Sequence, residues 1–172
     1  MLKQLTYRIL AWFTDFAIII SYALLLWLFT MLLIGNANLQ QIEANPIVGQ
    51  LVGFVTLTLA VFLYSYLTEK SSWKGTIGKK LLKLSVVVEK DSNRPNILLR
   101  NILKYLPWEV AHMGVHWIYF YESMGMETPL WVWITLIAPQ LIVLGYFVSI
   151  IFSKGRSSIY DRIAGTKVVL KV

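Results

Sequence analysis

Residues 8–34 read RILAWFTDFAIIISYALLLWLFTMLLI, and this stretch decides the fold. No charged residue follows Asp15 until Glu43. Because an α-helix crosses a bilayer with about 20 consecutive apolar residues, the stretch predicts a membrane span at 9–34. Arg8 and Asp15 stand seven residues apart at its start, so a helix places them on one face. A charged side chain inside a bilayer costs about 2.5–3.5 kcal/mol, so Asp15 needs a partner or water.

The composition of the whole chain fits the same class. Of its 172 residues, 57% are hydrophobic and 15% are charged, whereas soluble domains have about 45–50% and about 25%. We therefore expect one membrane domain covering 1–172. The chain has no cysteine, which excludes disulfides and thiol chemistry. The first apolar run is too long for the hydrophobic part of a signal peptide, so we expect it to be a retained span.

Hydropathy predicts an all-α membrane protein with four spans. The expected spans are 9–34, 47–67, 105–121 and 130–152, with a central loop at 68–104 and a tail at 153–172. In the second span, Gly49 and Gly53 form a small-xxx-small pair that permits close approach of another helix.

The net charge is +7, and the positively charged residues are confined to certain segments between and beside the expected spans. Lysine and arginine stand before the first span, in the central loop and in the tail, and none stands in 35–46 or 122–129. The positive-inside rule then predicts a multi-pass protein of the cell inner or plasma membrane with both termini in the cytoplasm. We expect these charges to contact anionic lipids, at about 1 kcal/mol per charge, and not nucleic acid. The expected lipid-facing residues are Lys74, Lys79, Lys80, Lys83 and Arg100.

The two cytoplasmic segments carry weak local patterns. Residues 76–84 and 96–104 predict short interfacial helices, and 85–89 predicts a strand. The segments also resemble each other: aligning Lys74 with Arg156 matches Thr76 with Ser158, Lys80 with Arg162, and Val86-Val87 with Val168-Val169. We hypothesise two parallel two-helix halves, with the two valine pairs forming a small β-ribbon.

Three titratable residues form a stripe on the third expected span. Glu109, His112 and His116 lie on one helical face, and their cost in a membrane predicts that they point to an interior. One interpretation is polar contact between helices, worth about 0.6 kcal/mol each. A second is a relay for protons or Na⁺. A third is a metal site, because Glu-x-x-His occurs on metal-binding helices, although the chain has no second such motif.

The two aspartates also leave alternatives open. Asp15 is either a structural partner of Arg8 or another arginine, or an ion-coupling carboxylate. Asp161 is expected in a short helix capped by Ser157 or Ser158. It is either a solvated neighbour of Arg162 or a buried partner of Arg8 or Arg100 that ties the halves together.

Three motifs together resemble the RDD family of bacterial membrane proteins. They are Arg8-x-x-Ala11-x-x-x-Asp15, Thr76-x-Gly78-Lys79 with Leu84-x-Val86, and Asp161-Arg162-x-Ala164-Gly165-Thr166 before Val168-Val169. The resemblance maps Arg8, Asp15 and Asp161 onto the residues that give this family its name. Lys83 departs from the pattern, since members often have glycine there. The resemblance implies a multi-span domain, usually taken to be a transporter, with sodium–proton exchange suggested for some members.

We therefore expect a non-enzymatic membrane protein that transports or couples a small ion or solute. Asp15, Glu109, His112 and His116 would be the coupling residues, with no cofactor, in a homo-oligomer or with a membrane partner. The alternative is a membrane scaffold or assembly factor whose polar stripe binds a partner helix. A third hypothesis is a membrane enzyme with a metal at Glu109, His112 and His116. A shared interior for Asp15 and the stripe would favour transport.

Overall fold

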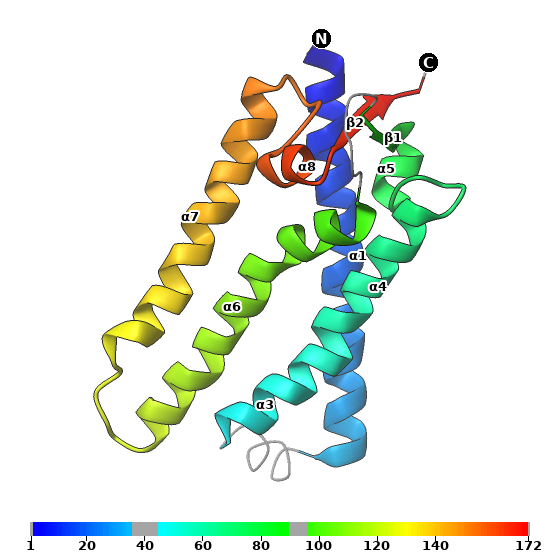
Figure 1. Ribbon diagram of the computed structural model, residues 1–172. Helices are drawn as coiled ribbons and strands as arrows, with labels where there is room; N and C mark the ends of the chain where they lie inside the picture. Colours follow the sequence, from blue (N-terminus) through cyan, green and yellow to red (C-terminus); the bar gives the residue numbers. More distant parts are fainter. Residues whose placement is uncertain (1, 36–44, 90–95, 172) are drawn as a thin grey trace.

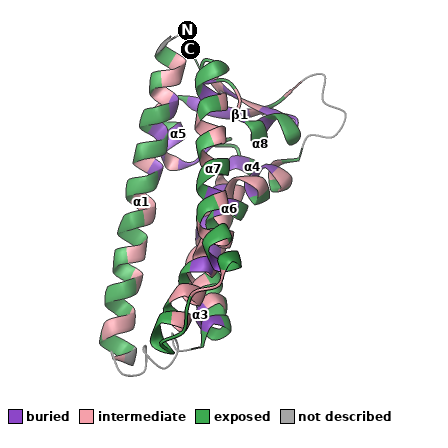
Figure 2. Ribbon diagram, turned by 90° about the vertical axis from the view of Figure 1, so that its left-hand side faces the viewer, coloured by how far each residue is buried: buried purple, intermediate pink, exposed green. Residues whose placement is uncertain are grey.

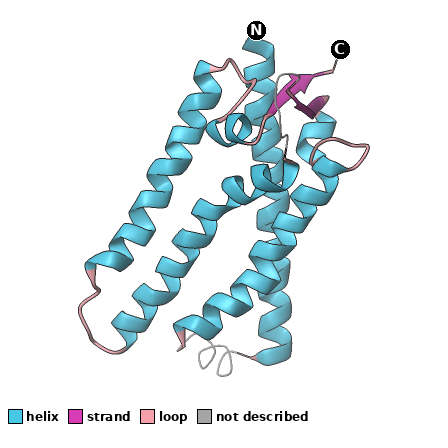
Figure 3. Cartoon of the chain, viewed as in Figure 1, coloured by secondary structure: helices cyan, strands magenta, loops and turns pink. Residues whose placement is uncertain are grey.

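The computed structural model describes residues 2–35, 45–89 and 96–171. It is mostly helical, with a small sheet at one end (Figures 1 and 3). The long helical segments are α1 (Leu2–Ile34), the continuous run of α3 (Pro46–Gly53), the π-helical turn η1 (Phe54–Thr58) and α4 (Leu59–Lys70), then α6 (Ile97–Ser123) and α7 (Leu130–Phe152). The short elements are α5 (Ile77–Leu81), β1 (Leu84–Val88), α8 (Ile159–Ile163) and β2 (Thr166–Leu170).

Within residues 2–35, 45–89 and 96–171, three helices are long and apolar enough to cross a membrane. They cover Lys3–Leu33, Pro46–Lys70 and Leu130–Phe152. The fourth long helix, α6, has 27 residues but does not belong to this set. It carries Arg100, Lys104, Glu109 and two histidines. The structure thus gives three candidate spans where the sequence predicts four.

Helix α6 joins two elements that the sequence analysis separates. The interfacial helix expected at 96–104 and the span expected at 105–121 form one helix with Pro107 inside it. Proline has no N–H, so the Leu103 carbonyl loses its helical partner. The Tyr146 hydroxyl of α7 donates to this carbonyl oxygen at 3.0 Å. A neighbouring helix therefore satisfies the carbonyl, and α6 continues through the proline.

Buried residues gather at the end of the molecule that carries α5, α8 and the two strands, which we call the sheet end (Figure 2). The start of α1 and the end of β2 both lie there (Figure 1). Its small apolar core consists of Ala11, Leu84, Val86 and Val168. Farther along α1 the apolar side chains are exposed, as expected where lipid is the solvent. The sheet end is thus the part of the chain with a water-soluble type of core.

The two strands confirm the expected β-ribbon. They pair antiparallel, with Val86 opposite Val168. The helix expected at 76–84 is shorter than predicted, because Leu84 already belongs to β1.

The local resemblance between the two cytoplasmic segments also has a structural counterpart. The N–H of Val86 donates to Lys74 O at 2.6 Å, and at the matched positions Val168 donates to Arg156 O at 2.8 Å. Two further bonds are reciprocal: Glu89 N to Gly165 O at 3.0 Å, and Lys171 N to Lys83 O at 2.7 Å. The segments around α5 and α8 therefore repeat one backbone arrangement about the ribbon.

Candidate functional site: an ion-pair chain and a polar helix interface

Six charged residues form a continuous ion-pair chain at the sheet end, and none of these residues is more than 9% exposed. Their charges alternate, and they come in turn from α1, α8, α6, α4, α5 and again α1. The six residues of this ion-pair chain are Arg8, Asp161, Arg100, Glu69, Lys79 and Asp15. Because this series of ion pairs begins and ends on α1, it forms a closed path through five helices.

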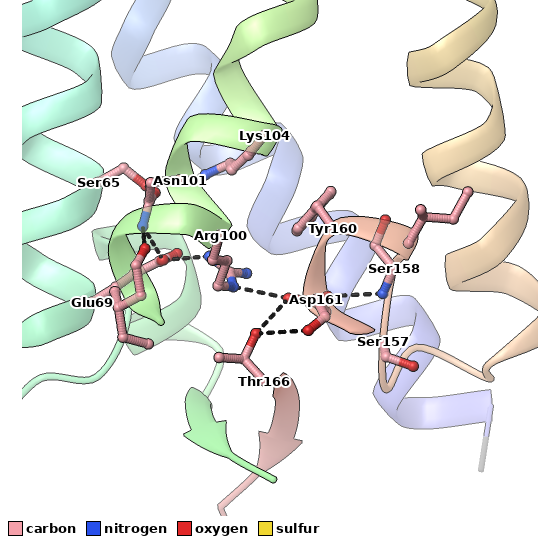
Figure 4. Close-up of polar contacts among 12 residues, drawn as sticks. Ser65, Glu69, Arg100, Asn101, Lys104, Ser157, Ser158, Tyr160, Asp161 and Thr166 are labelled. Atoms are coloured by element: carbon pink, nitrogen blue, oxygen red, sulfur yellow. Dashed lines mark hydrogen bonds and ion pairs between the residues drawn. The ribbon is translucent and has the colours of Figure 1, made fainter. Parts of the chain in front are cut away.

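Asp161 is the second residue of this chain and joins two arginines. Figure 4 shows it beside Arg100. Its Oδ1 accepts from Arg100 Nε at 2.8 Å, and its Oδ2 accepts from Arg8 Nη2 at 2.5 Å. Its Oδ2 also accepts from the N–H of Ser158 at 2.8 Å, which forms a capping box at the start of α8. The structure thus decides between the two interpretations of Asp161, because the carboxylate contacts both arginines and is buried.

The charge of Asp161 is fixed by its neighbours. Burial by itself raises the pKa of this carboxyl group. The guanidinium groups of Arg100 and Arg8, together with the Ser158 N–H, outweigh burial and hold the pKa below its usual range. The carboxylate therefore stays ionised near neutral pH, and the alternation of charges along the ion-pair chain is maintained.

Glu69, which the sequence analysis does not identify, links α4 to two cations. Arg100 Nη1 donates to Glu69 Oε2 (Figure 4). Lys79 Nζ donates to Glu69 Oε1 at 3.1 Å. The Asn101 amide adds a third bond, to Oε2 at 3.0 Å. One sequence signal exists: an acidic group in the last turn of a helix opposes the helix dipole and needs cationic partners.

The lysines and arginine expected at the lipid surface divide into two groups. Lys79 and Arg100 are 8% and 0% exposed, because both are enclosed by the ion-pair chain, so the structure differs from the expectation for these two. Lys74, Lys80 and Lys83 are exposed. Only this second group has the exposure that the expected contact with lipid requires.

Asp15 of α1 binds the start of α5. Its Oδ1 accepts from Gly78 N at 2.9 Å, and its Oδ2 accepts from the Thr76 hydroxyl at 2.5 Å. Its cationic neighbour is Lys79, at 3.8 Å, where the sequence analysis expects an arginine. A Cβ at Gly78 would lie 2.4 Å from Ala11 O. Asp15 therefore acts as a cap supplied by another helix, at a contact that requires glycine.

The stripe on α6 lies elsewhere, against α3. Gln50 Nε2 of α3 donates to Glu109 Oε1. The other oxygen, Oε2, lies 4.0 Å from His112 Nδ1, and the rings of His112 and His116 have centroids 4.7 Å apart. The three side chains thus follow one another along the α3–α6 interface, which we call the polar interface.

The two glycines of α3 make room for the imidazoles. A Cβ on Gly49 would lie 2.8 Å from His116 Nδ1, and a Cβ on Gly53 would lie 2.4 Å from His112 Cε1. The close helix approach that the small-xxx-small pair predicts therefore takes a specific form, in which each glycine accepts one histidine. The π-helical turn η1 begins directly after Gly53, and such turns are frequent at functional sites.

Hydrogen bonding at the polar interface is incomplete. Within residues 2–35, 45–89 and 96–171, six buried side-chain atoms have no hydrogen-bond partner, and four of them belong to Gln50 and the stripe. These four atoms are Gln50 Oε1, Glu109 Oε2, His112 Nδ1 and His116 Nε2. Buried polar atoms are nearly always satisfied, so a group of unsatisfied ones calls for an explanation.

The structure separates the residues expected to share one interior. Asp15 binds α5 at the sheet end, whereas the stripe faces α3, whose start lies at the opposite end of the molecule (Figure 1). In the part of the chain that the structure describes, no three histidine or acidic residues are arranged to hold a metal ion. The geometry therefore gives no support to a metal at Glu109, His112 and His116.

Apolar helices with exposed hydrophobic faces, joined by a buried polar ring, define a multi-pass membrane protein. The model of the RDD family matches residues 2–165, so the chain belongs to the RDD family. The comparisons with curated proteins and with solved structures give no match. Arg8, Asp15 and Asp161, which the resemblance maps onto the residues that name the family, all lie in the ion-pair chain.

Proposed function

We propose that this protein carries protons, or a small cation exchanged for them, across the membrane along the polar interface. The observation that carries the proposal is the group of unsatisfied buried atoms on Gln50, Glu109, His112 and His116. Ionisable residues inside a membrane protein typically line proton relays or ion paths. A carboxylate followed by two imidazoles supplies three groups that accept and release protons in turn.

The spacing of the stripe suits transfer through intervening water. The 4.0 Å separation of Glu109 Oε2 and His112 Nδ1 exceeds a direct hydrogen bond, and polar atoms beyond 3.5 Å are often bridged by water. From Glu109 to His116 the helix rises about 10 Å, which is about a third of the hydrocarbon layer. An imidazole ring can both accept and donate a proton, so histidine is suited to a proton relay.

This function requires α6 to be the fourth span, with both termini in the cytoplasm of an inner or plasma membrane. The position of the chain's ends at one end of the molecule supports an even number of spans. The exclusion of lysine and arginine from 122–129 supports the orientation. Within the expected span, Glu109, His112 and His116 turn toward α3, which leaves the apolar residues of α6 for α7 and lipid.

The ion-pair chain holds the helices in place and is not part of the path. Every oxygen of its three carboxylates already accepts a hydrogen bond from a cation or from an N–H or O–H donor. Buried ion pairs of this kind fix the arrangement of helices, and losing one partner is costly. In this proposal Asp15 is a structural residue and not a coupling residue.

A second candidate function rests on α1. The most apolar window of this helix has no buried residue, so its sides are open to lipid or to another helix. This observation favours a membrane scaffold in which α1 packs against a partner helix or a second copy. The stripe is less suited to partner binding than expected, because α3 of the same chain already covers it.

Proton flux into sealed vesicles tests the leading proposal. The purified protein is reconstituted in liposomes with an internal pH dye, and a potassium gradient with valinomycin drives proton entry, with and without a sodium gradient. We expect uptake by the wild type and a loss of at least tenfold in Glu109→Gln. Glu122→Gln is the matched control, because Glu122 is an exposed glutamate near the end of the same helix. No uptake by the wild type, or equal uptake by Glu109→Gln, would contradict the proposal.

A further inference from the structure

Two adjoining clefts open at the sheet end, beside α5 and the ribbon. One has a volume of about 350 Å³ and is lined in part by Lys80, Lys83 and Lys171. The other has a volume of about 410 Å³ and is lined in part by Lys3, Lys83 and Lys171. Each cleft thus has three lysines, and two of them are shared. No acidic residue is among the described residues that line either cleft.

The charges of these four lysines are not neutralised by neighbours. Among the ion pairs between described residues, none includes Lys3, Lys80, Lys83 or Lys171. Lys79, the residue immediately before Lys80, differs from these four lysines because it is buried and paired with Glu69. The clefts therefore concentrate positive charge that remains available to an anion.

Aromatic rings hold two of the ammonium groups close to the clefts. Lys80 Nζ lies 3.5 Å from the ring centroid of Trp73, which lines the first cleft. Lys3 Nζ lies 5.6 Å from the ring of Tyr7, which lines the second. Cation–π contacts of this kind limit the freedom of a lysine side chain. Lys80 and Lys3 are thereby held beside Lys83 and Lys171, which line both clefts.

The clefts lie at the depth expected for lipid headgroups. Helix α1 has 33 residues and is about 50 Å long, longer than a bilayer of about 40–45 Å with its headgroups. Its first turns, with Lys3 and Tyr7, therefore lie in the headgroup layer or just beyond it. Leu81, which also lines the second cleft, is 69% exposed and offers apolar contact beside the charges.

We propose that the two clefts together bind the headgroup of an anionic lipid that carries two phosphate groups. One phosphate occupies each cleft, and Lys83 and Lys171 lie between them and contact both. The apolar part of the lipid contacts Leu81 and continues into the bilayer along α1. This inference does not depend on the proton path, because the clefts and the polar interface involve different residues.

Lipid titration of the purified full-length chain in detergent, followed by native mass spectrometry, tests the inference. The probes are cardiolipin, phosphatidylglycerol at twice the concentration to match phosphate, and inorganic pyrophosphate. We expect cardiolipin to bind at least tenfold more tightly than phosphatidylglycerol. The double variant Lys83→Gln/Lys171→Gln is expected to lose about tenfold or more in cardiolipin affinity.

The matched control is Lys70→Gln/Lys154→Gln, which removes the same charge from exposed lysines outside the clefts. It should keep the preference for cardiolipin. Equal binding of the two lipids at matched phosphate, or equal loss in both double variants, would overturn the inference in favour of general surface charge. Binding of pyrophosphate without cardiolipin would overturn the lipid assignment and indicate a soluble diphosphate. Thermal melting of each variant shows whether a loss of binding reflects loss of fold.

Discussion

The ion-pair chain and the polar interface both place charged or titratable groups inside an apolar molecule, yet they differ in how those groups are satisfied. At the sheet end, each carboxylate is bonded to cations or to backbone and hydroxyl donors. At the polar interface, Gln50, Glu109, His112 and His116 keep unpartnered atoms. Pairing of every carboxylate favours one arrangement of helices, although Arg100 Nη2 in the same chain has no hydrogen-bond partner. Unfilled hydrogen-bonding capacity is concentrated at the polar interface, which supports the proposal that the first region maintains the structure and the second carries protons.

The largest effect is expected at Asp161, which joins the two arginines of the ion-pair chain. Asp161→Ala leaves Arg8 and Arg100 buried without their shared partner, and we expect a loss of about 3–5 kcal/mol in the free energy of unfolding. Thermal melting and size-exclusion profiles of the purified protein measure this loss. Arg162→Ala, the exposed neighbour, should change stability by less than about 0.5 kcal/mol. A fully stable Asp161→Ala protein would remove the structural role of the ion-pair chain.

A smaller loss is expected where α5 meets α1. Gly78→Ala brings a Cβ to 2.4 Å from the Ala11 carbonyl oxygen, a backbone atom that cannot move aside alone. Overpacking of this kind typically costs about 1–3 kcal/mol. Gly145→Ala is the control, because its Cβ would meet only Ile159 Cδ1, at 3.9 Å. Equal melting temperatures of the two variants would show that the contact between α1 and α5 is looser than described.

The pH dependence of stability follows from the lowered pKa of Asp161. A carboxyl group whose folded pKa is lowered contributes stability that is present above its unfolded pKa, near 3.9, and is lost as the pH falls toward the folded value. We expect stability to be level between pH 7 and 5 and to fall below about pH 4, by up to about 1.4 kcal/mol per pH unit for this group. Denaturation curves across this range, with Asp161→Asn as comparison, measure it. A fall that begins above pH 5 would mean that other groups dominate.

The smallest effect is a gain at Lys83. Its φ is 55°, in the left-handed region, and the matched position in the second half is Gly165, with φ 62°. A left-handed conformation costs an L-residue about 1–2 kcal/mol, so Lys83→Gly should stabilise the protein by about 1 kcal/mol. Thermal melting tests this. A loss of stability would show that the Lys83 side chain contributes more than its backbone strain costs.

The sequence predicts local features of this molecule well. The expected span at 130–152 coincides with α7, and the two valine pairs form the expected ribbon. Apolar length and β-branched residues determine these elements locally. The departure from the family pattern at Lys83 also has a physical meaning, since the position requires a left-handed backbone.

Partner choice was harder to predict. Glu69 belongs to no local motif. Asp15 binds the start of α5 and lies near Lys79, whereas its structural interpretation named an arginine as the partner. Whether a charge on an amphipathic segment faces lipid or a buried carboxylate depends on how distant helices pack, as Lys79 illustrates. Gly49 and Gly53 are four residues apart, as are His112 and His116, so the two pairs can face each other. The register between α3 and α6 that brings them together follows from the fold alone.

One paired measurement tests the division between the two regions most directly. Glu69→Gln and Glu109→Gln make the same chemical change in the ion-pair chain and at the polar interface. We expect Glu109→Gln to melt like the wild type and to lose proton uptake in liposomes, and Glu69→Gln to lose thermal stability. Normal proton uptake by Glu109→Gln, together with an unchanged melting temperature for Glu69→Gln, would contradict the assignment of structure to one region and transport to the other.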